Sequence, residues 1–107
     1  MARYFSPHLI NEPPLLVLPS LAAKVGINHA ILLQQMHYWL RGSKHEHDGH
    51  KWVYNSYAEW QKQLPWLTVR GVRKVIGDLE RDGYIVSGTF NRMAFDKTKW
   101  YRIDYAT

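Results

Sequence analysis

The hydrophobic and polar positions between Thr68 and Gly83 repeat with the period of an α-helix. Because an α-helix advances about 100° per residue, each side chain falls on a definite face. The apolar face holds Val69, Val72, Val75, Ile76 and Leu79, and the opposite face holds Arg70, Arg73, Lys74, Gly77 and Arg81. Thr68 is a favourable N-cap and Gly83 suits a left-handed helix end, so the pattern predicts a helix over 69–82.

The four cations of this helix form a basic stripe, which we define as Arg70, Arg73, Lys74 and Arg81. Asp78 and Glu80 fall to either side of the stripe, so we expect it to be unneutralised along its length. Such a stripe is either an ordinary solvated helix face or a contact surface for a polyanion. The pattern alone leaves both interpretations open.

The first half of the chain predicts two further helices and one strand. A short helix is expected over 20–25, and Asn28 is expected to cap a longer helix that stops at Gly42. Residues 42–51, "GSKHEHDGHK", predict a polar loop, and residues 52–55, "WVYN", predict a short strand.

The longer of these helices has apolar side chains around more than half of its circumference, so it must be covered on two sides. Its narrow polar face includes His29 and His37, for which we expect no role beyond solvation. A small domain offers few internal partners for so wide an apolar arc, so we predict a homodimer. The expected interface residues are Leu16, Ile31, Leu32, Met36 and Trp39.

Residues 56–82 predict a helix-turn-helix. Ser56 and Glu59 have the spacing of a capping box, and the short helix that they begin is expected to end near Pro65. Only the four residues "PWLT" separate this helix from the basic helix. Two helices joined by so tight a turn, the second with exposed cations at its start, are typical of this motif.

Two strand-like runs, "YIVSGTF" and "KWYRIDY", follow and predict a β-hairpin over 84–105, whose loop carries Arg92 and Lys97. The order of elements predicts an α+β fold, mostly α: a winged helix-turn-helix with a small antiparallel sheet whose hairpin is the wing. We expect a single domain over 1–107, with an extended, proline-containing segment at 1–19.

Charge is unevenly distributed along the chain. Residues 1–61 hold five Lys and Arg against four acids, whereas residues 62–102 hold nine against four. This local basic excess favours a polyanionic partner, either nucleic acid or an acidic membrane surface. We expect no membrane contact, because the apolar face of the basic helix is needed for the core of the domain. Cysteine is absent and no signal peptide is evident, which fits a cytoplasmic protein.

Catalysis is not predicted. The segment "KHEHDGHK" offers His45, His47 and His50 beside two carboxylates, which are plausible metal ligands. Their spacing matches no established zinc pattern, so we expect a solvated turn and no metal site. Glycine-rich phosphate loops and nucleophile elbows are also missing, so we expect neither a cofactor nor an enzyme.

The run "LERDGYIV" resembles the junction between recognition helix and wing in many winged-helix proteins. Two longer runs, "NEPPLLVLPSLAAKVGINHAILLQQMHYWL" and "WVYNSYAEWQKQLPWLTVRGVRKVIGDLERDGYI", span most of the chain. They resemble the N-terminal winged-helix domain of DnaD-like replisome organisers, the replication-initiation proteins of Gram-positive bacteria and their phages. In that family this domain is associated with binding of origin DNA or with self-association, and a second helical domain often follows.

The resemblance implies that double-stranded DNA is the partner and that Arg70, Arg73 and Lys74 contact it, with the wing cations Arg92 and Lys97 on flanking phosphates. The helical pattern adds Thr68, Gly77 and Arg81 to the expected DNA-binding set. Two alternatives stay open: a protein-interaction or oligomerisation module of the primosome, which could also bind other replisome-loading proteins, and a winged-helix transcriptional regulator. Salt dependence separates DNA binding from an apolar interface, because only DNA binding releases condensed counterions.

Overall fold

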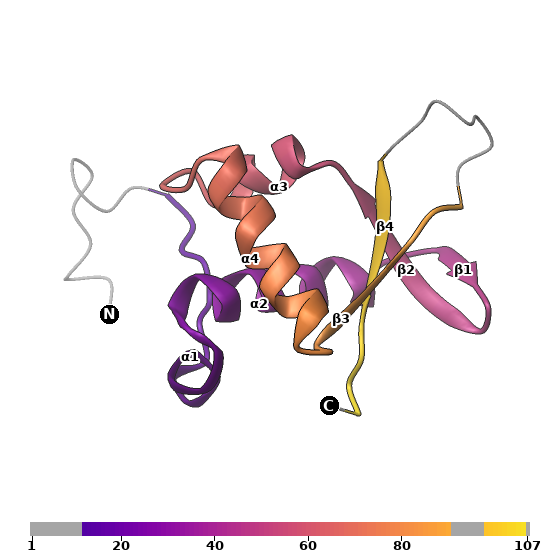
Figure 1. The fold of residues 1–107 in the computed structure, drawn as a ribbon, viewed down its shortest axis with the longest axis horizontal. Helices are drawn as coiled ribbons and strands as arrows, with labels where there is room; N and C mark the ends of the chain where they lie inside the picture. The colour runs from indigo at the N-terminus through magenta and orange to yellow at the C-terminus, as the bar shows by residue number, and fades with distance from the viewer. Residues whose placement is uncertain (1–11, 91–97, 107) are drawn as a thin grey trace.

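Helices and strands alternate irregularly along the part of the chain that this computed structural model describes, residues 12–90 and 98–106. The described elements are α1 (Pro19–Val25), α2 (Ile27–Arg41), β1 (His45–His47), β2 (His50–Asn55), α3 (Tyr57–Gln63), α4 (Val69–Arg81), β3 (Ile85–Gly88) and β4 (Lys99–Ile103). They form one α+β domain in which the helices lie to one side of a small sheet (Figure 1). The coarse prediction of fold class is therefore confirmed.

The sheet is antiparallel throughout, with the strand order β1-β2-β4-β3. Its last strand in sequence, β4, lies between β2 and β3 (Figure 1). Tyr101 of β4 is paired with Val53 on one side and with Ser87 on the other. β2 is thereby joined to the β3–β4 pair. The pairing of β3 with β4 confirms the predicted pairing of "YIVSGTF" with "KWYRIDY".

The main core lies between the helices and one face of the sheet. The two longest described helices, α2 and α4, each contribute an apolar face. Leu32 and Met36 are on the apolar face of α2, and Val72 and Ile76 are on that of α4. Trp60 of α3 is fully buried at the centre of this cluster. These contacts fix α4 against α2, which α4 crosses in Figure 1.

The other face of the sheet is covered by aromatic side chains. Side chains alternate between the two faces of a strand, so Trp52 and Trp100 point away from Val53 and Tyr101. Phe90 packs against both tryptophans, with ring centroids 4.9 and 6.1 Å apart, and stacks on His47 at 4.2 Å. Both tryptophans are buried, so this second cluster shields part of the face of the sheet opposite Val53 and Tyr101.

The prediction of a polar loop over 42–51 is wrong from His45 onward. His45–His47 and the start of β2 form a hairpin, joined through Asp48 and Gly49. Both turn residues have positive φ, 54° and 78°, as a two-residue turn that matches strand twist requires. The Asp-Gly pair is a hairpin signal, but its polar flanks concealed the strands.

The start of α2 also differs from the prediction. Gly26, with φ of 103°, occupies the N-cap position, and α2 begins at Ile27. The side chain of Asn28 instead accepts a hydrogen bond from the indole Nε1 of Trp66 at 2.8 Å. Asn28 therefore fastens the turn between α3 and α4 to α2 and does not cap a helix.

The local signals around α3 and α4 are confirmed. The backbone N–H of Ser56 donates to Glu59 at 2.9 Å and that of Glu59 donates to Ser56 at 3.1 Å, which completes the capping box. Gly83 has φ of 82° just after α4, as expected. The predicted bounds of α1 and α4 are each one residue away from those found.

Candidate nucleic-acid interface

Helix α4 presents the basic stripe to solvent because its other face is committed to the core. Val72, Val75, Ile76 and Leu79 are buried, and all four cations of the stripe are exposed, as is Gly77. The hydroxyl of Thr68 accepts the backbone N–H of Gly71 at 3.0 Å, so the helix has a fixed first turn. The predicted division of α4 into an apolar face and a cationic face is confirmed, except that Val69, the first residue of the helix, is exposed.

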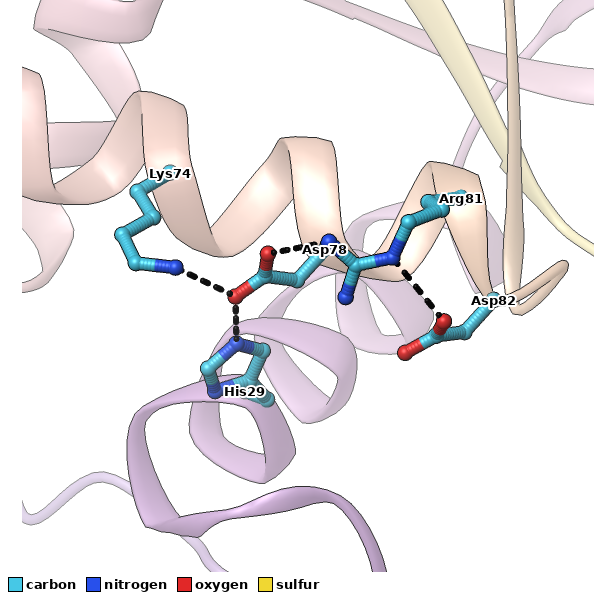
Figure 2. A network of polar contacts seen from close by, with 5 residues as sticks. All are labelled: His29, Lys74, Asp78, Arg81 and Asp82. Carbon is cyan, nitrogen blue, oxygen red and sulfur yellow. Dashed lines mark hydrogen bonds and ion pairs between the residues drawn. The ribbon is translucent and has the colours of Figure 1, made fainter.

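Asp78 neutralises the second half of the stripe, contrary to prediction. One oxygen of its carboxylate lies 3.4 Å from the Lys74 Nζ, and the other lies 3.2 Å from the Arg81 Nη1 (Figure 2). Arg81 also contacts Asp82 at 3.2 Å. The helix geometry explains this, because residues three or four positions apart are neighbours on a helix surface.

His29 holds Asp78 in this position. Its Nε2 lies 2.9 Å from the Asp78 Oδ2, and since an ionised carboxylate only accepts, Nε2 is the donor (Figure 2). The pKa of Asp78 is lowered from its ordinary value, first by this hydrogen bond and then by Lys74. The expectation that His29 is only solvated is therefore wrong: it joins α2 to the surface of α4.

The first half of the stripe is the part left without neutralising contacts. Within residues 12–90 and 98–106, no carboxylate lies within ion-pair distance of Arg70 or Arg73. The Arg73 guanidinium lies over the ring of Tyr57 from α3, 5.5 Å from its centroid. Free positive charge is therefore concentrated at the amino-terminal end of α4.

Lys99 is a further cation beside the Tyr57 ring, and it was not among the residues predicted from the sequence to bind DNA. Its Nζ lies 5.7 Å from the same Tyr57 ring and 3.9 Å from the carboxylate of Glu80. The signal was present, because Lys99 is the first residue of the "KWYRIDY" run. Its proximity to α4 follows only from the position of β4 in the sheet. The two predicted wing cations, Arg92 and Lys97, lie outside the described residues.

Gly77 is not required by packing within the domain. A Cβ atom placed on it would meet no atom within 4 Å among the described residues. Glycine in a helix interior costs about 1 kcal/mol relative to alanine, so this position is weaker than it needs to be. The opening beside Gly77 leaves room for a close approach by another molecule.

The predicted dimer residues divide into two groups. Leu32 and Met36 are fully buried, so their prediction as interface residues is wrong: α4 and the sheet already cover this side of α2. Ile31 is partly buried and packs against the same core. Leu16 and Trp39 are exposed, at 63% and 48%. Only these two remain available for an interface.

The histidine segment adds no further candidate site. Among the described residues, no three His, Cys, Asp or Glu side chains cluster as metal ligands would. His45 and His47 instead place their ring edges against Trp100, with centroids 5.0 and 5.2 Å away. Across the same residues, no helix is both long and apolar enough to cross a bilayer.

Comparison of the chain with protein-family models, curated proteins and solved structures gave no match in any of the three. The resemblance to replisome organisers therefore stays a prediction. Interpretation of this interface rests on the charge, exposure and geometry of its own residues.

Proposed function

We propose that this chain is a winged-helix domain that binds double-stranded DNA with α4 in the major groove. The observation that carries the proposal is the exposed, unneutralised start of α4, at Arg70 and Arg73. The helix is anchored by four buried side chains on its opposite face, so these cations project from a rigid element. Rigid presentation is what base readout in a groove requires.

The arrangement of elements supports the finer fold assignment. Five residues, 64–68, connect α3 to α4, and the β3–β4 pair follows α4 directly. A recognition helix followed by a hairpin, with a third strand supplied from before the helix-turn-helix, is the winged-helix arrangement. In this proposal β2 is that third strand, because it pairs with β4.

The cations have different roles in the proposed complex. Arg70 and Arg73 lie in the first two turns of α4, the part of a recognition helix that reaches base edges. Lys74 and Arg81 share Asp78 and therefore contribute a weaker attraction to phosphates. Arg92 and Lys97 would contact flanking phosphates, which adds affinity but no sequence information.

The resemblance to replisome organisers narrows the proposal to replication initiation. On this basis the duplex would be origin DNA and other replisome-loading proteins would be further partners. A titration that compares candidate origin DNA with random duplex tests this narrower claim. Equal affinity for both duplexes would favour a role without origin recognition.

The test of DNA binding uses two double variants that remove the same charge. Arg70→Ala/Arg73→Ala removes the free cations of α4, and Lys24→Ala/Lys62→Ala removes exposed cations from α1 and α3. Each phosphate contact contributes about −0.9 to the slope of log affinity against log salt. The α4 variant should bind duplex at least about tenfold more weakly, since each base contact is worth about 1–3 kcal/mol.

The control variant should bind within about twofold of the parent, because neither lysine belongs to the basic stripe and charges outside the proposed contact surface are screened by salt. Circular dichroism and urea unfolding establish that both variants are folded. If folded Arg70→Ala/Arg73→Ala binds duplex as tightly as the parent, α4 is not the DNA-contacting element.

A protein-interaction module is the second candidate, because three neighbouring apolar side chains, Leu16, Val17 and Leu18, are exposed in the N-terminal segment. Leu16 and Leu18 are 63% and 52% exposed, just before α1. This candidate, unlike the nucleotide-binding groove argued below, predicts a homodimer through this segment and Trp39, which Leu16→Asp/Leu18→Asp should convert to monomer in sedimentation experiments. A parent that is already monomeric at tens of micromolar contradicts this candidate.

A further inference from the structure

A groove with a volume of about 940 Å³ lies between the second half of α2, the start of β1, β2 and α3. This size is in the range of small-molecule and nucleotide sites. Tyr38 follows His29 by nine residues, or two and a half helical turns, so it projects from the opposite side of α2. The groove is therefore separate from the α4 surface to which His29 is bonded.

Three aromatic rings on the walls of the groove are open to solvent. Tyr38, Trp39 and Tyr54 are 62%, 48% and 41% exposed. Tyr38 and Trp39 meet edge to face at 5.1 Å, so one ring steadies the other. Exposed aromatic rings grouped in one groove are typical of surfaces on which a ligand ring stacks.

Trp39 is held in place by a hydrogen bond. Its indole Nε1 donates to the Gln63 Oε1 at 2.8 Å, and the same oxygen accepts from the Gln35 Nε2 at 2.8 Å. The ring is therefore oriented before any ligand arrives, which reduces the entropy lost on binding. The Gln63 amide nitrogen makes no hydrogen bond with a described residue, so it can donate to a ligand.

The floor of the groove contains an unused donor. Trp60 is fully buried and lines the groove, yet its Nε1 has no hydrogen-bond partner among the described residues. A buried polar group without a partner is uncommon, because burial removes the hydrogen bond to water. Because this atom is closed to solvent, a ligand in the groove could accept from it only if neighbouring side chains moved.

The rim of the groove is cationic. Arg41 and Lys44 line it beside His45, and no acidic side chain does so among the described residues. Arg41 also lines a neighbouring pocket of about 200 Å³ together with Lys51 and Arg102. That pocket likewise has no acidic lining residue in the described part of the chain, and the Arg102 Nε is buried without a partner. Arg41 thus links an aromatic groove to a second cationic pocket.

We propose that this groove binds an unpaired nucleotide of a single-stranded nucleic acid. The base stacks on Trp39 and Tyr38, its edge meets the amide donor of Gln63, and the phosphates follow the cations past Arg41. Aromatic rings combined with a cationic track are the features of single-strand binding. An acidic peptide would use the cations but has no need of the rings. The inference does not depend on duplex binding by α4.

The test is a titration of labelled oligothymidylate, about twelve nucleotides long, with the protein, in which binding is measured by fluorescence anisotropy. Trp39→Ala should weaken binding at least about fivefold, since a stacked base contributes that much or more. Trp39→Phe keeps an aromatic ring and should retain most of the affinity. Trp66→Ala is the matched control: Trp66 is 53% exposed, also donates its indole N–H to an amide oxygen, and lies outside the groove.

Further arms identify the source of the nucleotide and separate the inference from the proposed function. Oligouridylate and thymidine monophosphate as competitors distinguish an RNA strand or a free nucleotide from a DNA strand, and competition by any of them supports the site. Arg70→Ala/Arg73→Ala should bind oligothymidylate like the parent.

Four results overturn the inference. The first is that folded Trp39→Ala binds oligothymidylate as tightly as the parent, and the second is that Arg70→Ala/Arg73→Ala loses single-strand binding. The third is that polyglutamate competes with oligothymidylate as well as the nucleic acids do, which would show attraction by charge alone. The fourth is a parent that binds no oligothymidylate but is a dimer that Trp39→Ala dissociates, which assigns the groove to a second copy of the chain.

Discussion

Gly77→Ala should strengthen the fold and weaken DNA binding, and these opposite signs make it a sharp test of the α4 surface. The residue is exposed in the third turn of α4, between the levels of Lys74 and Arg81 on the stripe. An added Cβ meets nothing within 4 Å among the described residues, so the substitution introduces no clash within that part of the domain.

The stability change follows from helix propensity. Alanine is better than glycine in a helix interior by about 1 kcal/mol, which raises the melting temperature of a domain this size by about 4–6 °C. The binding change has the opposite sign. A DNA backbone in contact with the Gly77 Cα must move away by about 1.5 Å, the length of the added bond. We expect duplex affinity to fall about three- to tenfold, equivalent to about 0.7–1.4 kcal/mol.

The assay pairs thermal unfolding with duplex titration at moderate salt. Gly71→Ala is the matched control, because it lies on the same helix but about 100° around the axis from Arg70. Its added Cβ would be 3.4 Å from the Thr68 Oγ1, an ordinary contact. Gly71→Ala should gain stability and bind duplex like the parent. If Gly77→Ala is stabilised and binds duplex as tightly as the parent, no DNA approaches α4 at this point and the reasoning is refuted.

Three further predictions concern carboxylates and their partners. Asp78→Asn frees Lys74 and Arg81, so duplex affinity should rise about two- to fivefold and the salt slope should steepen by up to about 1; an unchanged slope contradicts this. The pKa values of Asp78 and Glu59 are lowered from 3.8 and 4.5, by hydrogen bonds from His29 and Ser56 respectively. The two ionised carboxylates stabilise the fold fully at a pH above their ordinary pKa values, and this stabilisation is lost as the pH falls through their lowered pKa values. The urea concentration at the midpoint of unfolding should therefore decline between about pH 5 and pH 3, and it should decline less steeply in Asp78→Asn. Ser56→Ala should cost about 1 kcal/mol of unfolding free energy in urea titrations, and a cost near zero would show that the cap contributes nothing.

Several features that depend on neighbouring residues were predicted correctly from the sequence, although the cap at Asn28 and the unneutralised state of the stripe were not. The capping box of Ser56 and Glu59, the cap at Thr68 and the left-handed Gly83 were all found where expected. Each of these uses atoms within a few residues of one another, so spacing alone determines it. The two faces of α4 follow from the same helical period.

The features that depend on distant residues could not be predicted. A helical wheel treats each helix alone, so it could not reveal that His29 bonds to Asp78, 49 residues later. Likewise, the wide apolar arc of α2 was visible, but its cover was not. Leu32 and Met36 were assigned to a partner chain because nothing in the pattern places α4 and β4 against them.

The aromatic groove illustrates the same limit. Tyr38 and Trp39 were visible as apolar positions of a helix, and Gln63 as a polar position of another. Their union in one cationic site depends on how α2, β2 and α3 meet in the fold. Composition indicates that aromatic residues are abundant, but it does not show which of them remain open to solvent.

The position of β4 between β2 and β3 has a consequence for folding during synthesis. A ribosome releases the helices, β2 and β3 before it releases Lys99–Ile103. Until then neither β2 nor β3 can pair with β4. The pairing of Val53 with Tyr101 joins residues that are far apart in the sequence, so it forms slowly. A nascent chain stalled before Lys99 would expose the open edges of two strands, which invite pairing with other chains. Such a chain would be prone to mispairing until β4 had been synthesised.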